Sequence, residues 1–275
     1  MLAPLLIMLR EGLEAALVIG IIATYLRRSG RSEWLPAVWV GVLLAVAVSF
    51  FAGATLQVLH AGFPQRTQEI FEAVVALAAV AVLTWMVFWM RSAARSIRSG
   101  LERDLDAAFD GPGRATIWAL VSMAFLAVAR EGLESVFFLL AIFQQSPGPG
   151  APLAALAGVA IAAGLGIGIY SGGVRLDLRR FFRISGLFIL LVAAGLVSGA
   201  LRSLHEAGLW NALQERVWDL SAVLPGSSVV GSVLSALVGY QESPALGEFL
   251  VWGLYLSVTL VLFLRPAPAT PARAA

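Results

Sequence analysis

The sequence contains no cysteine and no lysine, only two histidines, and few charged residues of any kind. Without cysteine, disulfides, thiolate metal sites and cysteine nucleophiles are excluded. Charged residues make up 13% of the 275 positions and hydrophobic residues 59%, whereas soluble domains carry about 25% charge. So little polar surface cannot cover a water-soluble globule of this size. The composition therefore excludes a typical cytoplasmic enzyme, a disordered chain and a nucleic-acid-binding protein.

The sequence contains several long apolar runs. About 20 apolar residues form a helix that crosses a bilayer core, and backbone groups inside lipid must bond within their own helix. The fold class is therefore predicted to be an all-α polytopic membrane protein with seven transmembrane helices. The predicted spans are residues 2–26, 35–60, 67–90, 115–143, 152–174, 184–204 and 246–264.

The positions of the 19 basic residues, all of them arginine, predict the orientation. Fourteen lie in the tail or in the loops after the first, third and fifth spans, and only three, Arg66, Arg202 and Arg216, lie toward the opposite side. Because arginine and lysine are enriched in cytoplasmic loops, we expect the N-terminus outside and the C-terminus in the cytoplasm.

The spans predict one transmembrane domain over residues 1–264. Two three-span sets of opposite orientation, at about 1–91 and 115–205, match the 3+3 inverted repeat of many transporters. The last span follows as one further C-terminal helix. The Pro/Ala-rich tail at 265–275 is expected to be disordered.

Two segments between the spans are longer than ordinary loops. Residues 91–114 are expected to be a cytoplasmic helical extension that ends at Gly-Pro-Gly. Residues 205–245 form an external amphipathic segment, for which we expect one or two helices on the membrane or over the bundle. That expectation rests on apolar residues recurring every three to four positions, at Trp210, Leu213, Val217, Leu220 and Leu224.

The most informative feature is a charged motif that occurs twice inside apolar spans. The first span contains Arg10-Glu11-Gly12-Leu13-Glu14, and the same five residues recur 120 positions later as Arg130-Glu131-Gly132-Leu133-Glu134. Six charges at mid-span would cost about 15–20 kcal/mol on insertion scales before any pairing. Groups that costly are expected to pair with one another or to bind a ligand.

The spacing within the motif indicates how its residues act. Glu11 and Glu14 share one helix face, Arg10 can pair with Glu14 one turn away, and Gly12 lets another helix approach. By depth, Glu11 lies about 13 Å and Glu131 about 18 Å below the outer ends of their spans. Two antiparallel helices can therefore bring four carboxylates to a similar level.

A third acidic pair, Glu69 and Glu72, lies near the outer end of the third span and is expected to form an entry site or to extend the central site. Oxygen ligands without cysteine or histidine favour hard cations. The four motif glutamates and two arginines carry a formal charge of −2, which suits a divalent or trivalent ion. The residues alone predict a channel or carrier for such a cation and do not name the metal.

Other interpretations of these residues stay open. The motif pairs could be structural ion pairs that hold a helix crossing. Glu69 and Glu72 could be solvated carboxylates at a helix start, where the helix dipole favours them. A membrane-embedded lipid-phosphate phosphatase is a further alternative, because the segment Leu224–Ser228 faintly resembles a phosphate loop, although no arginine is adjacent. A proton-coupled exporter of small molecules is a third.

The doubled Arg-Glu-Gly-Leu-Glu motif, with the acidic pair between its copies, resembles the oxidase-dependent iron transporter family. This family includes the fungal high-affinity iron permeases and the bacterial EfeU-type permeases. The resemblance extends over nearly the whole chain, including the external segment Trp218–Pro225 and Gly239-Tyr240-Gln241.

The resemblance implies a permease, not an enzyme, that imports iron across the cytoplasmic (inner) membrane, as Fe(III) after external oxidation or as Fe(II). It implies iron as substrate, no permanently bound cofactor, and contact with membrane lipid. A periplasmic iron-binding protein and a haem peroxidase or other ferroxidase are the implied partners. Some relatives are assigned to lead. The implied roles are metal ligands at Glu11, Glu14, Glu131, Glu134, Glu69 and Glu72, and charge balance or orientation by Arg10 and Arg130.

Overall fold

The computed structural model describes residues 2–93, 97–109, 113–145, 150–172 and 177–265. The described residues are almost entirely helical, and their β pairing is limited to an isolated bridge between Arg216 and Ala245. The all-α class is therefore confirmed. The helices are α1 (Leu2–Arg28), η1 (Ser32–Trp34), α2 (Leu35–Ala61), α3 (Gln65–Ala93), α4 (Ile97–Phe109), α5 (Gly113–Gln145), α6 (Gly150–Tyr170), α7 (Leu178–Glu206), α8 (Val229–Val238) and α9 (Leu246–Leu264).

Each predicted span coincides with one of these helices, but the helices differ in how clearly they suit a membrane. By length and composition, five could cross one, namely Ser32–Ala61, Gln65–Met90, Gly150–Tyr170, Arg180–Glu206 and Leu246–Leu264. The two predicted spans outside this set correspond to α1 and α5, which carry the charged motifs. The helices indicate an integral membrane protein, while the count of seven spans stays a prediction.

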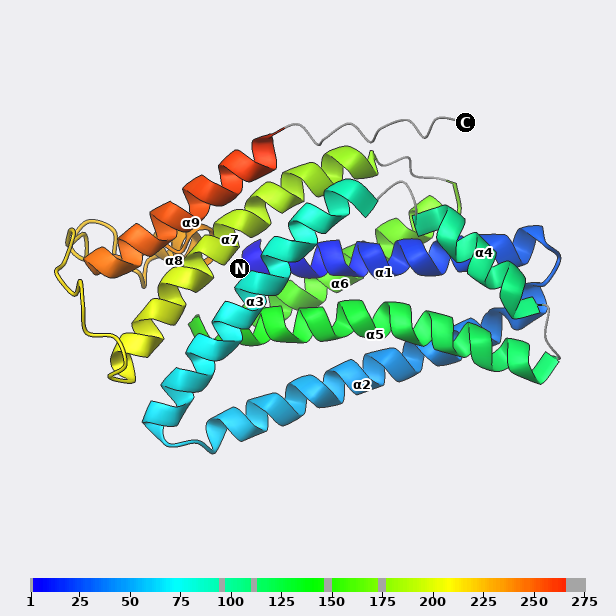
Figure 1. Ribbon diagram of the computed structural model, residues 1–275, viewed down its shortest axis with the longest axis horizontal. Coiled ribbons are helices and arrows are strands. Elements are labelled where there is room, and N and C mark those ends of the chain that lie inside the picture. The colour runs from blue at the N-terminus through cyan, green and yellow to red at the C-terminus, as the bar shows by residue number, and fades with distance from the viewer. Residues whose placement is uncertain (1, 94–96, 110–112, 146–149, 173–176, 266–275) are drawn as a thin grey trace, which may run out of the picture.

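The principal helix pairs join the two halves of the chain (Figure 1). α1 packs along α6, α2 along α5, and α3 along α7, while α9 covers α7. In Figure 1, α3, α7 and α9 run together at an angle to α1, α2 and α5. No half of the chain therefore forms a closed bundle by itself.

Glycine lets the paired helices approach closely. A Cβ on Gly158 of α6 would lie 2.5 Å from the carbonyl oxygen of Leu5 in α1, and a Cβ on Gly166 would lie 2.6 Å from the Ala16 Cβ. Because both contact positions advance in the same direction, α1 and α6 run parallel. The matching contacts between α2 and α5 are Gly41 with Val121 and Gly53 with Val136.

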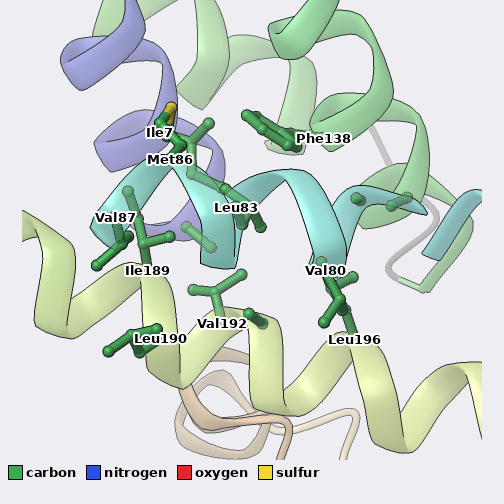
Figure 2. Packing of buried hydrophobic residues seen from close by; sticks show 14 of the residues in the cluster. Ile7, Val80, Leu83, Met86, Val87, Phe138, Ile189, Leu190, Val192 and Leu196 are labelled. Atoms are coloured by element: carbon green, nitrogen blue, oxygen red, sulfur yellow. The ribbon is translucent and has the colours of Figure 1, made fainter. Parts of the chain in front are cut away.

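The largest apolar cluster lies where α3 and α7 meet the motif helices (Figure 2). Ile7 of α1 and Phe138 of α5 pack into it and are fully buried. The cluster positions α1 and α5 relative to α3 and α7. Its labelled α3 and α7 members are Val80, Leu83, Met86, Val87, Ile189, Leu190, Val192 and Leu196.

The predicted helical extension at 91–114 contains α4, which packs across α1 and α5. Leu105 of α4 is fully buried with Ile22 and Leu120 from those two helices. The Tyr25 hydroxyl donates a hydrogen bond to Asp106. Of the Gly-Pro-Gly at which this helix was expected to end, Gly111 and Pro112 lie outside the described residues, and Gly113 begins α5.

The predicted helix through Trp210 and Leu224 is wrong. The stretch is irregular, because some of its backbone amides bond to a later segment, and those of Val223 and Leu224 close only a single turn on Leu220. The Val217 N–H donates to the Pro244 carbonyl, and the Leu220 N–H donates to the Glu242 carbonyl. Within the external segment the described helix is α8, which begins after Ser228. The tail predicted to be disordered lies outside the described residues from position 266 onward.

Candidate metal centre

The two charged motifs meet where α1 and α5 pack together. One carboxylate oxygen each from Glu11, Glu14 and Glu131 lies within 4.8 Å of the others. Glu11 and Glu14 are buried, and Glu131 is partly buried. Glu134 is one turn from Arg130 on α5 and repels both Glu11 and Glu14. The structure therefore brings all four predicted motif glutamates into one electrostatic cluster, three of them with oxygens within 4.8 Å of one another.

Each motif arginine pairs with the glutamate one turn later on its helix. The Arg10 Nε lies 3.1 Å from Glu14 Oε1, and the Arg130 Nε donates to Glu134 Oε1 at 3.1 Å. The two arginines differ in exposure, since the Arg10 side chain is 1% exposed and the Arg130 side chain is 39% exposed. The cluster is therefore more accessible from the Arg130 side.

Aromatic rings hold the arginines in place, a role that sequence reasoning missed. The Arg130 guanidinium lies 4.8 Å from the centre of the Trp89 ring and 5.7 Å from that of Trp85. Arg10 lies 6.0 Å from the Phe182 ring. Cation–π attraction at these distances favours a fixed guanidinium. From the sequence, the tryptophans of α3 would be expected to lie at the membrane interface. Their contact with Arg130 depends on the packing of α3 against α5, which the sequence of α3 does not reveal.

Buried polar atoms remain without hydrogen-bond partners throughout the cluster. Among the described residues these include both carboxylate oxygens of Glu11 and one oxygen each of Glu131 and Glu134. Nη1 of Arg10 also lacks a hydrogen-bond partner, and its Nε contacts Glu14 at 3.1 Å without hydrogen-bond geometry. Because buried polar groups in proteins are nearly always satisfied, this concentration of orphaned oxygens indicates a site made for a ligand.

The motif glycines act as close-contact positions. A Cβ on Gly12 would lie 2.7 Å from the Ala162 Cβ of α6, and a Cβ on Gly132 would lie 2.2 Å from the Ser49 Oγ of α2. The absence of a side chain at these positions lets α6 and α2 press against the cluster. Ser49 is buried without a hydrogen-bond partner among the described residues. It is a polar neighbour of the second motif that the sequence interpretation did not single out.

The acidic pair on α3 lies apart from the motif cluster. Glu72 Oε1 is 3.1 Å from His60 Nε2, and Glu69 interacts with Glu206 and Ser203 of α7. Neither belongs to the group of oxygens within 4.8 Å of one another. Of the two sequence expectations for this pair, the structure does not support an extension of the central site.

Comparison with known proteins agrees with the family that the sequence resembles. The model of the Iron permease FTR1 family matches residues 1–269. The chain belongs to this iron permease family. "Ferrous iron permease EfeU" of Shigella sonnei (strain Ss046) is 52% identical over 277 residues and covers 100% of both chains. The protein of that name from Yersinia pestis is 50% identical over 270 residues, covering 98% of this chain and 95% of its own.

Membership of the iron permease family has two consequences. The chain is a membrane permease and not an enzyme, which removes the phosphatase alternative. In agreement, the Gly226 N–H of the presumed phosphate loop donates to Glu242, and the Ser228 hydroxyl caps α8. No solved structure matches the chain.

Proposed function

We propose that the chain imports iron across the cytoplasmic membrane and that the motif cluster binds the ion as Fe(II). The observation that supports this is the group of Glu11, Glu14 and Glu131 oxygens within 4.8 Å of one another, with further unpartnered oxygens around it. Three ligand oxygens at about 2.0–2.2 Å from one ion lie about 3–4 Å from one another. Side-chain rotations that move these oxygens together by about an ångström would bring all three onto a shared ion.

The charge of the cluster favours a divalent ion. Four glutamates and two arginines leave a formal −2, which one Fe(II) neutralises. Glu69 and Glu72 do not join the cluster and so do not raise this charge. The name "Ferrous iron permease" of the relatives agrees with Fe(II). Arg10 and Arg130 pair with Glu14 and Glu134, and an ion that enters the cluster would replace part of that attraction.

We further propose the seven-span arrangement, with the N-terminus outside, the C-terminus inside, and one domain over residues 1–264. The helix pairs support an inverted repeat, because exchanging α1 with α5, α2 with α6 and α3 with α7 leaves the set of pairs unchanged. Equivalent contacts recur in both halves: Gly12 with Ala162 and Gly132 with Ser49, then Ala16 with Gly166 and Val136 with Gly53.

Iron uptake by reconstituted protein tests the function. Liposomes that contain the purified chain are expected to accumulate radioactive iron supplied as Fe(II) with ascorbate, and to do so faster than when it is supplied as chelated Fe(III). Empty liposomes are the control, and excess Pb(II) is the competitor that tests the lead alternative. Uptake of Fe(III) alone would overturn the ionic form, and absence of any iron uptake would overturn the function. The periplasmic partner and the peroxidase stay predictions.

Cysteine labelling tests the topology, since the natural chain has no cysteine that must first be removed. Gly62 and Ser29 are exposed and lie at opposite ends of α2. We expect an impermeant maleimide to label a Gly62→Cys variant in spheroplasts, and to label a Ser29→Cys variant only after the membrane is permeabilised. The reverse pattern would overturn the proposed orientation.

A further inference from the structure

The two copies of the charged motif differ in how they present their last glutamate. Glu14 contributes an oxygen to the group within 4.8 Å, whereas its counterpart Glu134 lies outside that group. One oxygen of Glu134 accepts the hydrogen bond from Arg130 Nε at 3.1 Å, and the other is buried without a hydrogen-bond partner among the described residues. Glu134 therefore borders the converging oxygens while its arginine holds it.

The two motif arginines differ in a matching way. The Arg10 side chain is enclosed by protein, and its guanidinium lies 6.0 Å from the one phenyl ring of Phe182. The Arg130 side chain is partly exposed, and its guanidinium lies near two indole rings, those of Trp89 and Trp85. Of the two arginines, Arg130 has more room to move.

Trp85 and Trp89 together form a surface suited to a guanidinium. They lie one turn apart on α3, and their stacked rings have centres 6.0 Å apart and planes inclined by 24°. The Arg130 guanidinium lies 4.8 Å and 5.7 Å from the two ring centres, within the range of about 6 Å over which cation–π attraction acts. Tryptophan is the strongest aromatic partner, and a guanidinium stacks well on it. Arg130 can therefore lose Glu134 and still keep an electrostatic partner.

We propose that Arg130 is a switch that controls a fourth ligand of the ion site, and that Trp85 and Trp89 are its positioning residues. Without an ion, Arg130 pairs with Glu134. When a divalent ion occupies the three converging glutamates, the guanidinium moves fully onto the indole rings, and the released Glu134 carboxylate binds the ion. This inference rests on the proposed function, because it takes the motif cluster to be the place where the transported ion binds.

Electrostatics favours this movement. Arg130 Nε lies 4.0 Å from Glu131 Oε1 as well as 3.1 Å from Glu134 Oε1, so the guanidinium is beside one of the converging glutamates. A divalent ion on that glutamate repels the guanidinium, and the repulsion is strong in a low-dielectric interior. Once Arg130 has moved, four glutamates and Arg10 leave a formal −3 around the ion, compared with −2 before. Ion binding and arginine displacement therefore support each other.

Mn²⁺ binding to the purified chain in detergent, followed by electron paramagnetic resonance, tests the switch. We expect Trp89→Leu to weaken Mn²⁺ binding by about threefold to tenfold, because the displaced guanidinium loses its closer ring. Trp89→Phe keeps an aromatic face and should recover most of the affinity. Trp39→Leu is the matched control and should bind Mn²⁺ as the natural chain does. Trp39 is an exposed tryptophan on α2, two residues from Gly41, which contacts α5 at Val121, nine residues before Arg130.

A second background separates a switch from a merely structural contact. Arg130→Gln removes the guanidinium, so the indole has nothing left to position. Adding Trp89→Leu to that variant should change the Mn²⁺ affinity by less than about 1.5-fold, and such non-additivity is the signature of residues that act on one another. Trp85 is more exposed, and Trp85→Leu provides the same comparison, with about a twofold effect, if Trp89→Leu does not fold.

Three results would overturn the switch: no Mn²⁺ binding by the natural chain, unchanged affinity on removal of either indole, or equal weakening with and without Arg130. Iron uptake by the same proteins is measured separately. An Arg130-dependent effect in a chain that transports no iron would overturn the proposed function and not the switch. Iron uptake combined with equal weakening in both backgrounds would overturn the switch and not the function.

Discussion

Iron uptake is expected to fall by at least about 100-fold when Glu11 or Glu131 is replaced with glutamine, because even outer-shell partners of a metal site contribute 10–100-fold. Glutamine keeps the size of the side chain and removes the charge, so the packing of α1 against α5 and α6 should survive. The measurement is initial uptake of radioactive Fe(II) into liposomes at equal amounts of folded protein.

Glu248 supplies the matched control for these variants. It is also a buried glutamate on a membrane helix, and it pairs with Arg202 at 3.2 Å, away from the motif cluster. Glu248→Gln should therefore keep most of the uptake. If it lost as much uptake as Glu11→Gln, the effect would come from the loss of any buried carboxylate, and the ligand assignment would be wrong. Normal uptake by both motif variants would have the same consequence.

Replacing Gly158 with alanine is expected to prevent the stable pairing of α1 with α6. The new Cβ would lie 2.5 Å from the Leu5 carbonyl oxygen and 3.0 Å from the Leu9 amide nitrogen, so the backbones of two helices would have to separate. Overpacking of this kind costs about 1–3 kcal/mol, which corresponds to roughly 2–12 °C in apparent unfolding temperature for a chain of this size. The readout is the monodisperse fraction that survives heating in detergent.

Gly164 provides the comparison on the same helix. A Cβ there would meet nothing within 4 Å, and alanine is a better helix former than glycine. Gly164→Ala should therefore be as stable as the natural chain or slightly more stable. Equal heat resistance of the two alanine variants would show that the α1–α6 contact is looser than described, and the argument that motif glycines enable close approach would lose its support.

Much of the fold was predictable because long apolar runs in a sequence identify membrane helices. The predicted spans at 35–60 and 246–264 match α2 and α9 to within two residues at each end. The doubled motif also predicted the meeting of α1 with α5, since buried charges on two helices stabilise each other only when they come together. Here the need of buried charges for partners explains both the repeated motif in the sequence and the packing of α1 against α5.

The predictions failed where contacts with segments distant in the sequence determine the local structure. The periodic apolar residues from Trp210 to Leu224 predicted a helix, but backbone bonds to residues 242–247 override that pattern. Trp89 and Ser49 reach the motifs only through helix packing, and no periodicity within α3 or α2 marks them. The separation of Glu72 from Glu11 likewise depends on how far α3 is displaced along the bundle, which a single sequence does not specify.

The pairing of helices across the two halves also determines the order in which the protein can assemble during synthesis. α1 packs along α6, so its partner emerges only after more than a hundred further residues have been made. Until then, Arg10, Glu11 and Glu14 have neither Glu131 nor the close contact between Gly12 and Ala162. The nascent first helix must therefore be kept near the insertion machinery or the membrane surface. A chain truncated before α5 should be a substrate for quality-control proteolysis, because its buried charges have not yet found their partners.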